Sequence, residues 1–90
     1  MIKPQFILAR QAQKDLLSLP PHIANKLLMW MDLVENKGWL YAKSIPGYRC
    51  EILTGRRFGQ RSIRLSKGYR AMFCIEGDLI EILEVNKHDY

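Results

Sequence analysis

The second half of the chain is divided by glycines into four short runs of strand-forming residues. The runs cover residues 49–53, 60–66, 69–75 and 79–85. Apolar and β-branched residues in runs bounded by glycine predict strands, and such short spacings predict an antiparallel meander. Gly77-Asp78 fits the tight turn of a hairpin between the last two runs. This half is therefore expected to form an antiparallel sheet.

The first half shows helical periodicity in two segments. Apolar residues recur at steps of three and four from Ala9 to Leu19 and again from Pro21 to Lys37, which is typical of amphipathic helices. Pro20-Pro21 separates the two segments, because proline is tolerated in the first turn of a helix and not in its interior. Lys37 followed by Gly38 fits the end of the second segment, with a cation in the last turn and glycine beyond it. A two-helix hairpin is therefore expected before the sheet. The apolar run at 4–8 fits either a buried strand or the entrance to the first helix.

Length and composition restrict the class of protein. Ninety residues suit one domain, expected to span residues 1–90. The chain has no signal-peptide pattern and no apolar stretch of transmembrane length, so we expect a cytoplasmic protein without membrane contact. Cys50 and Cys74 are isolated and are expected to be small apolar residues without chemistry. Neither metal-ligand spacing nor a phosphate-binding glycine loop occurs, so no metal or other cofactor is expected.

The positive charge is concentrated in residues 43–70. Eight bases and a single acid, Glu51, give this segment a net charge of +7, whereas the whole chain has +5. A small sheet that gathers so many arginines is suited to bind a polyanion, and this pattern indicates nucleic acid.

Strand alternation separates the arginines from the apolar residues. Ile63 and Leu65 point to one face and Arg64 to the other, and Arg70 likewise opposes Phe73. If the apolar face meets the helices, Arg64 and Arg70 share the open face. The turn between Gly55 and Gly59 holds two more arginines within reach of a ligand on that face, Arg56 and Arg57.

Several segments together resemble the RelE/ParE toxin superfamily. They are Ala12 to Leu19, Gly47 to Gly55, Gln60 to Leu65, Gly68-Tyr69-Arg70 and Val85 to Tyr90. The resemblance implies an α+β fold with an N-terminal strand, a two-helix hairpin and an antiparallel sheet with a basic concave face. It also implies the toxin of a type II toxin–antitoxin system. Members of the RelE, YoeB and HigB branches cut messenger RNA on the ribosome, so the implied partners are a cognate antitoxin, the ribosome and messenger RNA.

The resemblance also implies catalytic roles for individual residues. Arg70 matches the arginine that contacts the scissile phosphate, Arg64 falls near the place of a catalytic lysine, and Glu51 falls where YoeB-like toxins have a glutamate base. His88 and Tyr90 resemble the C-terminal histidine and tyrosine of those toxins. Asp89 separates the two here, so either His88 or Asp89 occupies the place of the acid. The residues expected to bind RNA are Arg56, Arg57, Arg61, Lys67 and Lys87.

Elementary chemistry agrees with a ribonuclease that needs no metal. Cleavage through the 2′-hydroxyl requires a base, positive charge on the phosphorane and an acid for the leaving 5′-oxygen. Arginine stays protonated and grips phosphate bidentately, histidine titrates near neutral pH, and the Tyr90 ring is suited to stack on a base. Glu51 is equally suited to be a salt-bridge partner of Arg49 or Arg61.

Two other functions remain open from the sequence. A ParE-like inhibitor of DNA gyrase acts by binding and needs no aligned base and acid. A non-catalytic RNA-binding protein on the same fold binds RNA in a salt-dependent way and leaves growth unharmed.

Overall fold

The computed structural model describes residues 3–87 and confirms the expected α+β architecture. The chain begins with a strand, β1 (Gln5–Leu8), so the open choice at residues 4–8 is settled in favour of a strand. Two helices follow, α1 (Arg10–Ser18) and α2 (Pro21–Lys37), and then a short unpredicted helix, α3 (Trp39–Ala42). The remaining strands are β2 (Glu51–Ile52), β3 (Arg61–Ser66), β4 (Tyr69–Glu76) and β5 (Leu79–Lys87).

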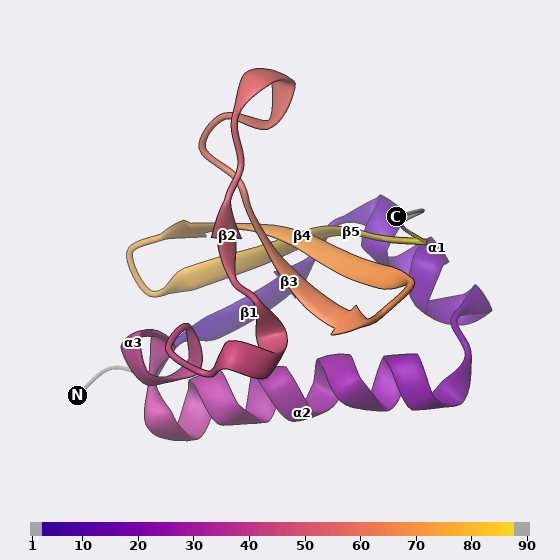
Figure 1. Cartoon of the computed structure of the whole chain (residues 1–90). Coiled ribbons are helices and arrows are strands. Elements are labelled where there is room, and N and C mark those ends of the chain that lie inside the picture. The colour runs from indigo at the N-terminus through magenta and orange to yellow at the C-terminus, as the bar shows by residue number, and fades with distance from the viewer. Residues whose placement is uncertain (1–2, 88–90) are drawn as a thin grey trace.

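All five strands form one sheet in the order β1-β5-β4-β3-β2 (Figure 1). The last four strands are the predicted antiparallel meander, and β1 pairs with β5 in parallel. β2 is shorter than the predicted run 49–53, because Arg49 has a left-handed backbone (φ 44°) at the end of the turn Pro46–Tyr48. Helix α2 lies along one face of the sheet, and α1 lies near β5.

Proline and glycine set the bounds of α2 as the sequence predicts. Pro21 occupies the first turn, where a missing N–H costs nothing. Gly38 adopts φ 85° and donates its N–H to the carbonyl of Val34 at 2.8 Å, which ends the helix. The chain therefore turns back toward the sheet directly after Lys37.

The core lies between α2 and the sheet and is built around Trp30. This side chain is fully buried and contacts the rings of Phe6, Trp39 and Phe73, with ring centroids 4.9 to 6.4 Å apart. Ile63 and Ala71 are also fully buried on the helix side of the sheet. Burial of each large apolar side chain stabilises the fold by roughly 1.5–3 kcal/mol.

A β-bulge in β5 controls which residues reach the other face. Met72 pairs with Glu84, whereas the next residue, Phe73, pairs with Ile82, so Leu83 is an extra residue. A bulge of this kind reverses the alternation of side chains along the strand. Ile82 before it and Val85 after it are both buried in the core. Glu84 therefore points to the face opposite α2.

None of the helices within residues 3–87 is long and apolar enough to cross a membrane.

Candidate active site

The face of β2 to β5 that lies opposite α2, called the open face here, carries two rows of paired residues. Residues that pair across antiparallel strands point to the same face. One row holds Glu51, Ser62, Met72 and Glu84. The other row holds Arg64, Arg70 and Asn86. Arg64 and Arg70 therefore share the open face, as strand alternation predicts.

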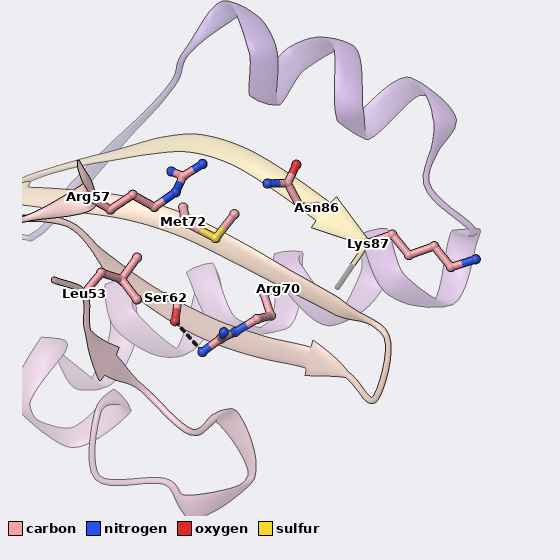
Figure 2. A pocket seen from close by; sticks show the side chains of 7 residues that line it. All are labelled: Leu53, Arg57, Ser62, Arg70, Met72, Asn86 and Lys87. Carbon is pink, nitrogen blue, oxygen red and sulfur yellow. Dashed lines mark hydrogen bonds between the residues drawn. The ribbon is translucent and has the colours of Figure 1, made fainter. Parts of the chain in front are cut away.

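Arg70 makes the central contact of this face. Its Nη2 atom donates to the carboxylate of Glu51 at 2.7 Å. The same atom donates to the hydroxyl of Ser62 at 3.0 Å (Figure 2). The Arg70 side chain is 18% exposed, whereas that of Glu51 is 56% exposed. Ser62 is fully buried beneath them. Arg70 is thus held by the buried hydroxyl of Ser62, and its guanidinium contacts the solvent-exposed carboxylate of Glu51.

The salt-bridge partner of Glu51 differs from the one that the sequence suggests. The sequence offers Arg49 or Arg61 as partners, and in the structure the partner is Arg70. β2 and β3 place Glu51 opposite Ser62, in the row next to Arg70. The candidate base and the candidate phosphate-binding arginine therefore lie side by side, which the catalytic assignment requires.

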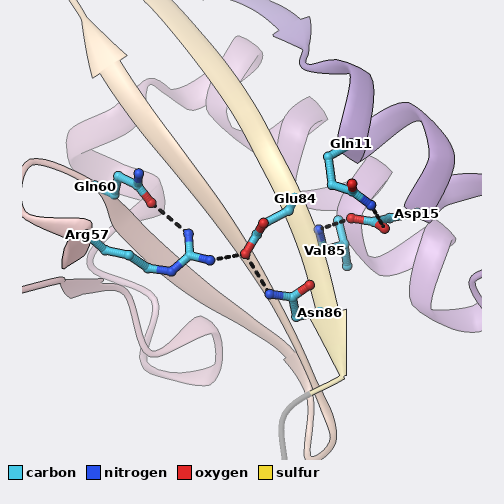
Figure 3. A network of polar contacts seen from close by, with 7 residues as sticks. All are labelled: Gln11, Asp15, Arg57, Gln60, Glu84, Val85 and Asn86. Atoms are coloured by element: carbon cyan, nitrogen blue, oxygen red, sulfur yellow. Dashed lines mark hydrogen bonds and ion pairs between the residues drawn. The ribbon is translucent and has the colours of Figure 1, made fainter.

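Arg57 reaches the same face from the loop between β2 and β3. It belongs to the 3₁₀ turn Gly55–Arg57, and its Nη2 atom forms an ion pair with Glu84 of β5. Its Nη1 atom donates to Gln60 at 2.9 Å, and Asn86 donates to the same oxygen of Glu84 at 2.6 Å (Figure 3). The ion pair of Arg57 and Glu84 thus connects the loop between β2 and β3 with β5, the last strand of the meander.

Arg57 and Arg70 border one pocket of about 370 Å³. Met72, which is almost fully buried, and Leu53 give it an apolar surface, and Ser62 and Asn86 add polar groups (Figure 2). Guanidinium groups beside an apolar surface are suited to a ligand that combines anionic and planar apolar parts, and a nucleotide has both.

Lys87 also lines this pocket, and its side chain extends away from Arg70 in Figure 2. The other expected RNA-binding residues lie outside the pocket. Arg61 pairs with Phe73 on the helix side of the sheet, and its guanidinium lies 5.4 Å from the centre of the Trp39 ring. Arg56 and Lys67 are exposed in the turns before β3 and before β4. Arg64 donates from Nε to the carbonyl of Ser66 at 3.3 Å.

The C-terminal part of the expected site lies outside the described residues. His88, Asp89 and Tyr90, the candidates for the acid and for base stacking, follow Lys87. Their assignment therefore stays a prediction.

The two cysteine thiols are poor nucleophiles in their surroundings. Burial raises the pKa of Cys50 above its ordinary value, and nearby Arg61 and Lys43 oppose this increase. Burial also raises the pKa of Cys74, and the carboxylate of Glu81 raises it further. Both cysteines are free. Because the thiolate is the reactive form, a raised pKa makes both cysteines weaker nucleophiles than an ordinary thiol.

Sequence reasoning missed Glu84. The alternation of residues after Gly77 in the sequence gives no reason to single out one of the acidic residues there. The signal that identifies Glu84 is the bulge at Leu83, which depends on strand register and is visible only in the fold.

No protein-family model and no curated protein matches this sequence. Solved structures do match. YafQ in the E. coli DinJ-YafQ toxin-antitoxin complex has a TM-score of 0.77 at 19% identity, and the match covers 97% of this chain and 94% of that one.

Two further matches have similar values. A single-residue mutant of YafQ from E. coli has a TM-score of 0.76 at 20% identity, with 94% of this chain and 93% of that chain covered. The YoeB-YefM complex from Staphylococcus aureus has a TM-score of 0.74 at 18% identity, with 99% and 100% covered. The chain therefore has the fold of the RelE/ParE toxin superfamily, as the sequence resemblance implies.

Proposed function

We propose that this chain is the toxin of a toxin–antitoxin pair and that it cleaves messenger RNA on the ribosome. The observation that supports this most strongly is the contact between Arg70 and Glu51 beside the pocket of the open face. In RNA cleavage, the group that removes the proton from the 2′-hydroxyl and the group that neutralises the phosphate act on neighbouring atoms. A base and a cation 2.7 Å apart fit that requirement.

The proposed reaction assigns one step to each residue. Arg70 binds the scissile phosphate, and Glu51 turns from Arg70 to the 2′-hydroxyl and accepts its proton. The 2′-oxygen attacks phosphorus, and the bond to the 5′-oxygen breaks. The products are a 2′,3′-cyclic phosphate and a 5′-hydroxyl. The proton for the leaving oxygen comes from the C-terminal acid, for which His88 is the first candidate and Asp89 the second.

The position of Glu51 supports the role of a base. Its carboxylate is more than half exposed, so it changes partners at little cost in desolvation. Arg70 is the less exposed partner and is fixed by Ser62. Arrival of a phosphate at Arg70 therefore releases Glu51 for proton transfer, while the cation stays in place.

Substrate binding is proposed to use further bases of the open face and its turns. Arg64 lies opposite Arg70, and Arg56 and Lys67 are exposed on loops at the ends of β3. Contacts of this kind with RNA phosphates make affinity fall as salt rises. Tyr90 is proposed to stack on a base of the messenger RNA.

An antitoxin is the proposed protein partner. The solved structures that share this fold include YafQ with DinJ and YoeB with YefM, both named as toxin–antitoxin complexes. We propose that a cognate antitoxin covers the open face of this chain and blocks access to Arg70.

The test is primer extension on messenger RNA bound to purified 70S ribosomes. The wild-type protein, Arg70→Ala and the charge-matched Arg10→Gln on α1 are compared, with a control without ribosomes. We expect ribosome-dependent cuts from the wild type and from Arg10→Gln and none from Arg70→Ala. A folded wild-type protein that stops growth without cutting would sink the proposal and direct attention to gyrase, through a DNA supercoiling assay.

A further inference from the structure

Arg57 is the second arginine that lines the pocket beside Arg70, and it is held by different hydrogen bonds. Arg57 comes from a loop, where a long side chain ordinarily has many conformations. Here both terminal nitrogens of its guanidinium have fixed acceptors, Glu84 on one side and Gln60 on the other. These contacts occupy two of its five N–H donors. Arg57 is also a lining residue of the pocket, and 39% of its side chain is exposed.

Glu84 is suited to hold Arg57 because its own position is fixed. Its carboxylate is only 22% exposed, and Asn86 donates to the same oxygen that Arg57 contacts. The next residue along β5, Val85, donates its backbone N–H to the carboxylate of Asp15 on α1 at 2.9 Å (Figure 3). Gln11 donates to the other oxygen of Asp15 at 2.8 Å.

The support from α1 replaces a missing strand. β1 pairs with β5 only as far as the pair Leu8 and Ile82. Beyond this point the edge of β5 has no strand partner within residues 3–87, and Asp15 accepts the N–H that such a strand would have bonded. The bulge at Leu83 and the carboxylate of Asp15 thus set the direction of Glu84 and, through it, the place of Arg57.

We propose that Arg57 binds a second phosphate of the RNA, next to the phosphate on Arg70, and that Glu84 is the residue that positions it. The pocket then takes one nucleotide with a phosphate on either side, and its sugar and base lie against Leu53 and Met72. This inference rests on the proposed function in its choice of RNA as the ligand. It adds a second phosphate site and a role for Glu84 that does not touch the reacting atoms.

The test compares two uncleavable ligands made of 2′-O-methyl nucleotides. One is a dinucleoside monophosphate with a single phosphate, and the other is a trinucleoside diphosphate with two. Binding is measured by NMR titration of the arginine Nε–Hε signals, which detects millimolar affinity. We expect the wild type to bind the two-phosphate ligand about tenfold more tightly, because a charge-assisted contact is added. The signals of Arg57 and Arg70 are expected to move together.

Variants separate this role from simple structural support. Arg57→Gln is expected to reduce the tenfold ratio to about one, and to reduce the salt dependence for the longer ligand by roughly 0.7 in log–log slope. Glu84→Ala is expected to lower the ratio, and Glu84→Gln to keep part of it, since the amide oxygen still accepts from Arg57. The charge-matched Arg10→Gln should keep the full ratio. Damage to the fold would weaken the binding of both ligands alike and leave the ratio of their affinities unchanged.

Two results would overturn the proposal. One is an unchanged ratio in Arg57→Gln, and the other is a wild type that binds neither ligand at millimolar concentration. The experiment needs neither ribosomes nor cleavage, so it fails independently of the proposed nuclease. If the protein shows the tenfold difference in affinity but cleaves no RNA, the proposed nuclease activity is contradicted and the two-phosphate site is still supported.

Discussion

The two ion pairs of the open face have opposite patterns of burial. In the pair of Arg70 and Glu51 the cation is the protected partner, with 18% of its side chain exposed against 56% for the carboxylate. In the pair of Arg57 and Glu84 the carboxylate is the protected partner, with 22% exposed against 39% for the cation. The protected partner has further hydrogen bonds in each case, from Arg70 to Ser62 and from Asn86 to Glu84.

This difference indicates which group moves. A buried, hydrogen-bonded charge is costly to displace, whereas an exposed one exchanges its partner for water or a ligand at little cost. In the proposed mechanism, the carboxylate beside Arg70 is the group that leaves the pair and acts as a base. At Arg57 each partner has a second hydrogen bond, from Arg57 to Gln60 and from Asn86 to Glu84, so we propose that this pair stays together and that the other donors of Arg57 bind a ligand. One pair is suited to chemistry and the other to holding a ligand.

The largest expected effect is on Glu51. Glu51→Gln removes the proposed base but keeps the shape of the side chain, so single-turnover cleavage on ribosomes should fall by about 10²–10⁴-fold. The free energy of unfolding in urea should change by less than about 0.5 kcal/mol, because the pair is largely exposed on the carboxylate side. A variant that cuts at the wild-type rate would show that Glu51 is only a counterion of Arg70.

Glu84 should show the reverse pattern. Glu84→Ala leaves Arg57 and Asn86 without their shared acceptor, and we expect a loss of about 1–2 kcal/mol in unfolding free energy. Cleavage at saturating ribosome-bound messenger RNA should change little, while the concentration for half-maximal rate rises about tenfold. Glu84→Gln is the matched variant and should lie between the wild type and Glu84→Ala. A fall in the saturated rate as large as that of Glu51→Gln would erase the distinction between the pairs.

The smallest expected effect is on Asp15. Asp15→Ala removes the acceptor of the Val85 N–H and should cost about 1 kcal/mol of unfolding free energy. Asp15→Asn keeps an oxygen at that place and should cost less. Hydrogen exchange of the Val85 amide gives the local readout, and it should become faster in Asp15→Ala. Unchanged exchange would mean that α1 does not support the end of β5.

Sequence reasoning identified both arginines of these ion pairs but neither pairing. Alternation along β3 and β4 was enough to put Arg64 and Arg70 on one face, because both strands are regular across that stretch. The partner of Glu51 was not predictable, since β2 has only two residues and its register depends on the turn before it. Glycine spacing located the loop of Arg57 but not the direction of its side chain.

The positions of two other side chains also depend on strand register. Arg61 follows the alternation of β3 and lies on the helix side, over Trp39, away from the face that holds Arg64 and Arg70. Glu84 reaches the open face only because Leu83 is bulged. Helix bounds, in contrast, follow from local signals such as Pro21 and Gly38, and these were predicted correctly. Local stereochemistry is readable in a sequence, whereas register is set by contacts between distant segments.

The most direct test of the central claim is the cleavage of ribosome-bound messenger RNA with and without a 2′-hydroxyl at the cut site. The site is first mapped with all-ribose RNA, and a single 2′-deoxy nucleotide is then placed 5′ to the scissile phosphate. We expect a cut in the ribose RNA with 2′,3′-cyclic phosphate ends, no cut in the deoxy RNA and no cut by Arg70→Ala in either. Equal cleavage of both RNAs, or products ending in a 3′-hydroxyl, would rule out cleavage through the 2′-hydroxyl.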